Sequence, residues 1–208
     1  MTITYPLTLP TNPGVQAIRW RPMAVVAVAV SPFTKQRQTQ RNQGQVWQAD
    51  ITLPPIRSRE VVGQWIAFLL SLNGAEGFFK MGDPDNFGPQ GVATGSPVVS
   101  GANQIGGSLV TSGWTASTAG ILKAGDRIGL TSGSVMRLHK VLKDVDSDGS
   151  GNATLDIWPR VISSPSDGSP IELASPTSLF WLPDGIPEHD IDRLGHMTVT
   201  LNCMEHLT

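Results

Sequence analysis

The clearest hydrophobic pattern lies between Ile51 and Pro84, where it predicts one α-helix between two strands. Apolar residues recur there at spacings of three and four, which is the periodicity of one buried helical face. They are Val61, Val62, Trp65, Ile66, Phe68, Leu69 and Leu72. Ser58 is placed to cap the start of this helix, and Asn73-Gly74 to end it. Because the apolar face is wide, we expect the helix to lie against a β-sheet.

Before the helix, the pattern predicts a long hairpin. Met23–Val30 alternates valine with alanine and is predicted to be a buried strand, and Val46–Leu53 alternates as a second strand. Phe33–Gln45, between them, is nearly all polar, and Asn42-Gln43-Gly44 supplies turn residues. We predict one antiparallel hairpin over 25–53, whose distal half protrudes or pairs with another subunit. A solvated flexible loop is the alternative that composition leaves open.

The composition changes after Pro84. Residues 85–161 are rich in Gly, Ser and Thr with isolated apolar positions, which predicts a small inserted β-barrel domain. A Ser/Pro linker is predicted over 162–176, and His196–Leu207 alternates as a strand that returns to the sheet beneath the helix. We therefore predict a mainly β fold with one bracing helix. Its first domain, a β-sandwich or split barrel, is built from 1–84 and 177–208.

Composition narrows the function. Only 15% of the 208 residues are charged and the net charge is −2, which argues against a nucleic-acid binder that neutralises phosphates. No apolar run approaches the roughly 20 residues that cross a membrane, and the first residues do not have the pattern of a signal peptide. We expect synthesis in the cytoplasm, no specific nucleic-acid binding and no membrane association. The single Cys203 is expected to be a small buried residue on a strand.

One loop has metal-ligating residues. Asp144, Asp146 and Asp148 match the first, third and fifth positions of an EF-hand calcium loop. Leu155 stands where the twelfth-position glutamate belongs, and strands rather than helices flank the loop. Asp and Gly are also the residues that a hairpin turn needs. We therefore predict no metal, and these three aspartates are the candidate ligands for calcium.

No catalytic constellation is visible. The histidines lack metal spacing, and no nucleophile elbow, Walker loop or dinucleotide fingerprint occurs. We predict no enzymatic activity and no cofactor. Trp114 and Trp158 lie in strand-like contexts, where core packing is the ordinary role; an aromatic platform for sugar stacking is the sharper alternative.

Several segments, in this order, together resemble phage tail-tip proteins of the distal tail protein class. In the first part they are Ser31-Pro-Phe-Thr34, Gln45–Ala49, Leu53-Pro-Pro55, the helix and Gly77–Pro84; in the middle they are Gly125-Asp126, Arg137–Lys140, Asp146–Ala153 and Ile157–Arg160. The resemblance spans most of the chain, although the inserted region is short for the family.

The resemblance implies a structural role in the virion. Such proteins form a ring, usually of six copies, between the tail tube and the tail-tip hub. The first domain is the belt of that ring, the inserted domain points outward, and the lumen passes DNA. The long hairpin would contact the neighbouring subunit and the tube. The interface residues we expect there are Phe33, Lys35, Arg37, Arg41 and Trp47.

Two alternatives stay open. A tail-tube or tail-terminator ring protein would also have a long hairpin and a bracing helix, but such a subunit needs no inserted domain. A carbohydrate-binding module on the virion surface would use Trp114 or Trp158.

Overall fold

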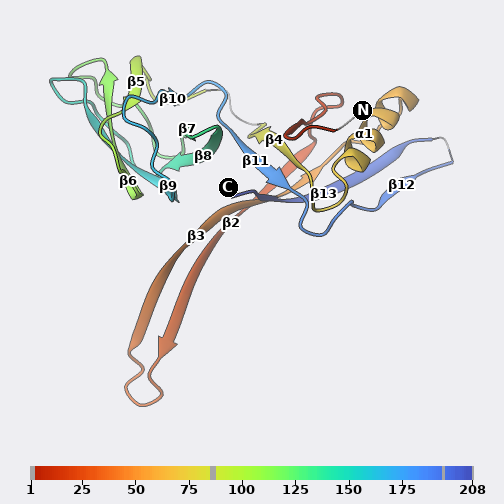
Figure 1. Ribbon diagram of the computed structural model, residues 1–208, viewed down its shortest axis with the longest axis horizontal. Helices are drawn as coiled ribbons and strands as arrows, with labels where there is room; N and C mark the ends of the chain where they lie inside the picture. The colour runs from red at the N-terminus through yellow and green to blue at the C-terminus, as the bar shows by residue number, and fades with distance from the viewer. Residues whose placement is uncertain (1–2, 85–87, 194, 208) are drawn as a thin grey trace.

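The chain is mainly β with one α-helix. The computed structural model describes residues 3–84, 88–193 and 195–207 (Figure 1). The elements are β1 (Leu7–Thr8), β2 (Ala17–Val30), β3 (Arg37–Thr52), α1 (Arg59–Ser71), β4 (Phe78–Gly82), β5 (Gly95–Val99), β6 (Gly106–Trp114), β7 (Arg127–Ser132), β8 (Val135–Val141), β9 (Ala153–Val161), β10 (Ile171–Glu172), β11 (Thr177–Trp181), β12 (His189–Ile191) and β13 (Met197–Glu205).

The first sheet joins the two ends of the chain. Its strand order is β1-β4-β11-β13-β3-β2, and β12 pairs with β13 as well. β13 is central, because β3 takes one of its edges while β11 and β12 share the other. The alternation predicted for this strand is confirmed, since Met197, Val199, Leu201 and Cys203 are all buried. These described strands form one sheet, and α1 is the layer that covers its apolar face.

The helix was predicted correctly in position and face, but not in its cap. Val62, Trp65, Phe68 and Leu69 are buried, and Phe68 contacts Phe79 of β4 edge to face. At the start, the Ser58 side chain makes no capping hydrogen bond, so that prediction was wrong. At the end, Asn73 and Gly74 both adopt positive φ, and the N–H of Gly77 donates to the carbonyl of Leu72. This is the left-handed helix end that Asn-Gly favours.

The second sheet is nearly closed into a barrel, in the order β10-β7-β8-β9-β6-β5. Its apolar side chains form a core separate from that of the first sheet. β10 lies inside the segment 162–176 that we predicted to be a linker. It pairs with β7, and Pro170 bridges to Val98 of β5, so this segment is part of the second sheet and the linker prediction was wrong. A strand of only two residues within a polar stretch is too short to be recognised from alternation in the sequence.

A buried ion pair joins the two sheets. Arg137 of β8 donates from Nε and Nη2 to the two carboxylate oxygens of Glu205 in β13, at 3.0 and 3.1 Å. Glu205 also accepts from the hydroxyl of Ser178 at 2.8 Å and from the N–H of Trp47 at 3.1 Å. Arg137 donates further to the carbonyls of Gln45 and Arg160. The network thus ties β3, β8, β9, β11 and β13 at one point.

A second buried pair stands where the chain leaves the first sheet. Asp83, directly after β4, pairs with Arg127 of β7, and its carboxylate is almost fully buried. Burial lowers the pKa of Arg127 from its usual value. The two ion pairs therefore join the second sheet to the first through two neighbouring strands, β7 and β8.

Breaking the larger network should destabilise the fold. Arg137→Met leaves the buried Glu205 carboxylate without its cation, and we expect the free energy of unfolding to fall by about 3–5 kcal/mol in urea denaturation. Arg137→Met combined with Glu205→Gln should recover part of that loss, because no buried charge is left unpaired. Arg160→Met, which removes a neighbouring guanidinium outside the ion pair, is the control. A loss under about 1 kcal/mol for Arg137→Met would contradict this account.

Candidate functional site

The most distinctive feature is the hairpin of β2 and β3, which projects far beyond the first sheet (Figure 1). The two strands pair from Ala17–Thr52 to Val30–Arg37, so the hairpin is longer than the range 25–53 that we predicted. We call residues 25–44 the distal hairpin. Its strand residues 25–30 and 37–43 are all exposed. Because Val26–Val30 pair with Arg37–Arg41 as antiparallel strands, the alternative of a flexible loop over this segment is wrong.

The turn predicted at Asn42-Gln43-Gly44 is a bulge instead. Ala24 pairs with Gln45 and Val26 with Arg41, so these three residues of β3 stand opposite Val25 alone. The chain reverses further out, where the N–H of Ser31 donates to the carbonyl of Gln36 and Lys35 adopts a positive φ. Asn42-Gln43-Gly44 therefore marks an irregularity within the strand, because a bulge also requires turn-type residues.

The distal hairpin has two chemically different faces. In an antiparallel pair, residues directly opposite each other point to the same side. The valine face holds Val26, Val28, Val30, Arg37, Thr39 and Arg41; the alanine face holds Ala27, Ala29, Gln38 and Gln40. The valine face is therefore apolar and basic, and the alanine face is uncharged.

The valine face corrects the prediction that Met23–Val30 is buried. Val26, Val28 and Val30 are 45, 54 and 55% exposed, which is unusual for three valines in a row on one face. The reason is that the partner strand over 37–43 has no apolar residue, and none of the described elements forms a second layer over these valines. That missing apolar partner is visible in the sequence and is the signal from which the exposure could have been predicted.

The predicted interface residues divide into two groups. Phe33 is 94% exposed at the tip, and Lys35, Arg37 and Arg41 are exposed beside it. None of the ion pairs among the described residues includes these three cations. Their role in an interface stays a prediction, but their side chains are accessible for one.

Trp47 does not belong to that surface. It is 5% exposed, its indole N–H donates to the carbonyl of Leu138 at 3.0 Å, and its ring meets Trp20 and Trp158 edge to face. The prediction of Trp47 as an interface residue was wrong, because alternation along β3 directs it into the core. It anchors the base of the hairpin to the second sheet.

Of the two tryptophans predicted as glycan contacts, one is excluded by burial. Trp114 is 4% exposed and donates from its indole N–H to the hydroxyl of Thr111 at 2.8 Å, so it is a core residue. Trp158 is half-buried and lines a surface cavity of about 310 Å³ at the base of the hairpin. Arg41, Leu142 and Arg160 line the same cavity.

The aspartates of the calcium-like loop accept hydrogen bonds from backbone N–H groups. Asp144 accepts from the N–H of Ala124 and pairs with Lys123, and these contacts lower its pKa. Asp146 accepts from the N–H of Gly120, and Asp148 from those of Ser150 and Asn152. Each carboxylate thus holds a different stretch of loop. Within the described ranges, no three His, Cys, Asp or Glu side chains form a group able to hold a metal ion.

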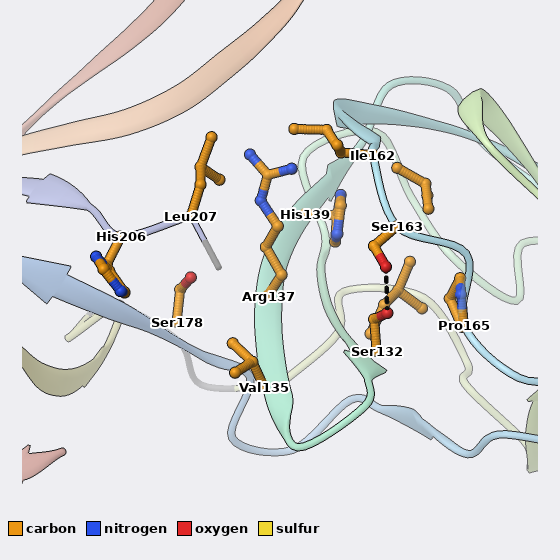
Figure 2. Close-up of a pocket in the computed structure, with 12 residues that line it drawn as sticks. Ser132, Val135, Arg137, His139, Ile162, Ser163, Pro165, Ser178, His206 and Leu207 are labelled. Carbon is orange, nitrogen blue, oxygen red and sulfur yellow. Dashed lines mark hydrogen bonds between the residues drawn. The ribbon is translucent and has the colours of Figure 1, made fainter. Parts of the chain in front are cut away.

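A cavity of about 120 Å³ lies beside the Arg137–Glu205 network (Figure 2). Figure 2 shows Arg137 and His139 of β8 between Ser178 and His206 on one side and Ser132 and Ser163 on the other. The polar groups bind one another: Ser132 and Ser163 share a hydrogen bond of 2.9 Å, and Ser178 donates to Glu205. This arrangement stabilises the junction of the two sheets.

Cys203 is buried as predicted, with Sγ 3.2 Å from the carbonyl oxygen of Ala49, and burial raises its thiol pKa to about 12. None of the helical structure in the described part of the chain has the length and apolar character that a membrane crossing requires.

Comparison with models of known protein families finds no match, and neither does comparison with curated protein sequences.

His139 should make stability depend on pH. It is buried, its Nδ1–H donates to the carbonyl of Pro159 at 2.6 Å, and burial lowers its pKa to about 3. The unfolded chain takes up a proton near the ordinary pKa of about 6.5, whereas the folded chain does so only near 3. The contribution of neutral His139 to the free energy of unfolding should therefore be fully present above pH 6.5. Below that pH the free energy of unfolding should fall by up to about 1.4 kcal/mol per pH unit.

The measurement is urea denaturation at several pH values for the wild type and for His139→Asn, whose side-chain amide can still donate to Pro159. The difference between the two should shrink as the pH falls from about 6 to 4. His189→Asn, at an exposed position of β12, is the matched control. Parallel pH profiles for wild type and His139→Asn would show that His139 is protonated in the folded chain as easily as in the unfolded one.

Proposed function

We propose that this chain is a structural protein of a phage tail that forms a ring of about six copies at the tail tip. The ring joins the tail tube to the tip hub and leaves a lumen for DNA. The observation that carries the proposal is the distal hairpin, a long two-stranded ribbon with an exposed apolar face. An isolated ribbon is marginally stable in water, so a ribbon of this length is expected to gain its stability from a partner.

Three further features support a ring of identical copies. β2 is an edge strand of the first sheet and leaves a row of backbone groups without a partner in the described chain. The hairpin projects from one side of the subunit, as a head-to-tail contact requires. The buried ion pairs make the two sheets one rigid unit, which suits a part that transmits force. The order of motifs that resembles distal tail proteins favours the tail tip over the tube.

The test is the native mass of the purified protein by light scattering, with negative-stain images of the same fraction. We expect closed rings of about six copies. The matched variant replaces residues 25–44 with Asn-Gly, which joins the paired Ala24 and Gln45 through a two-residue turn. It keeps Trp47 and the junction, so it should fold with a similar unfolding midpoint but remain a monomer. Rings formed by this variant would show that the hairpin does not mediate assembly.

The cavity beside Trp158 favours carbohydrate binding as a second candidate function. A half-buried indole next to Arg41 and Arg160 offers an apolar surface for a sugar ring and two guanidinium groups for its acidic substituents.

A glycan array that includes acidic saccharides is the test of that candidate. If the cavity binds glycans, Arg160→Ala should lose most of the signal while the thermal midpoint stays within a few degrees. The matched control is Arg19→Ala, which removes a guanidinium from β2 outside the cavity. An array with no signal for the wild type would remove the candidate.

A further inference from the structure

We propose that the valine face of one copy docks on the segment 184–192 of the next copy. This inference rests on the proposed ring, because it names the two surfaces that meet between neighbouring subunits. We call residues 184–192 the acidic segment. It comprises the loop after β11 and the short strand β12.

The acidic segment is the chemical complement of the valine face. Its nine residues include four carboxylates and neither Lys nor Arg: Asp184, Glu188, Asp190 and Asp192. Ile186 and Ile191 are 39 and 53% exposed among them. Apolar side chains flanked by carboxylates therefore stand on one surface, and apolar side chains flanked by Arg37 and Arg41 on the other.

Two of the four carboxylates are exposed and outside the ion pairs of the described chain, as are Arg37 and Arg41. Asp192 is held by His196 and Asp184 accepts from Asn202, whereas Glu188 and Asp190 are exposed and take part in none of the ion pairs among the described residues. Arg57 and Arg193 stand beside the segment, and the four carboxylates still outnumber them. Docking would pair these two carboxylates with Arg37 and Arg41, which take part in none of the ion pairs among the described residues.

The positions of the two surfaces require a second copy. β12 adds to the outer edge of β13, on the side away from β3, and the distal hairpin extends from the opposite side of the sheet. In Figure 1 the hairpin points away from β12, so a chain cannot bring its own two surfaces together. Two different patches that fit each other make a heterologous contact, and such contacts close into rings when the rotation allows.

Charge reversal tests this contact. Arg37→Glu with Arg41→Glu places carboxylates opposite the acidic segment, and we expect the concentration for half-assembly to rise roughly tenfold or more at low salt. Glu188→Arg with Asp190→Arg should have a similar effect from the other side. All four substitutions together should restore assembly to within about threefold of wild type, because attraction returns with the signs exchanged. Dilution series followed by sedimentation velocity give these values.

The matched control adds carboxylates to the other face of the same strand. Gln38→Glu with Gln40→Glu changes the alanine face, and assembly should stay within about twofold of wild type. All substituted side chains are exposed, so the unfolding midpoints should remain unchanged and report that each variant folds.

The outcomes separate this inference from the proposed function. Rings that tolerate both charge reversals would leave the ring standing and overturn the docking of these two surfaces. The inference would also be overturned if both charge-reversed variants assemble weakly and their combination assembles weakly too. The arginines and carboxylates would then meet different partners. A wild-type chain that remains monomeric at every concentration would overturn the inference and the ring together.

Discussion

The buried Arg137–Glu205 pair is the interaction on which the arrangement of this protein depends. It lies where strands from both sheets meet, and each carboxylate oxygen of Glu205 accepts two hydrogen bonds within the network. A charged pair in a dry environment tolerates little displacement, because separating the two charges exposes each to an apolar surrounding. The network also reaches Gln45 at the base of the hairpin. The direction in which the hairpin leaves the molecule is therefore set by the same contacts that join the sheets.

The hairpin is stabilised at its base and receives little from the rest of the chain beyond it. Trp47 packs between Trp20 and Trp158, and the backbone of Arg160 binds the side chain of Gln45. Past the bulge at residues 42–44, each strand forms β-pairs only with the other among the described residues. A rigid base with an outer half that lacks internal support is the construction expected of an element that completes its packing on another subunit.

Local pattern allowed the helix, β13 and the exposed basic tip to be predicted, because periodicity and residue type reflect one element at a time. Burial depends on what covers each element, and predictions of burial from the local pattern were wrong at several positions. Valines of β2 were predicted to be buried although they are exposed, and Trp47 was predicted at an interface although it points into the core. For Trp114 the core role was the ordinary expectation, and burial excludes only the alternative of glycan contact. The junction was not predictable from pattern, since Arg137 and Glu205 are 68 positions apart and nothing in either neighbourhood marks the other.

The central place of β13 in the first sheet bears on the order in which the two sheets form. The second sheet is drawn from residues 95–172 and can form while the chain is still being synthesised. The first sheet must wait, because its middle strand follows all of its other strands in the sequence. Until β13 arrives, β3 and β11 have no common neighbour and Arg137 has no Glu205. The direction of the hairpin is therefore fixed only after β13 has been made, although both strands of the hairpin are made early.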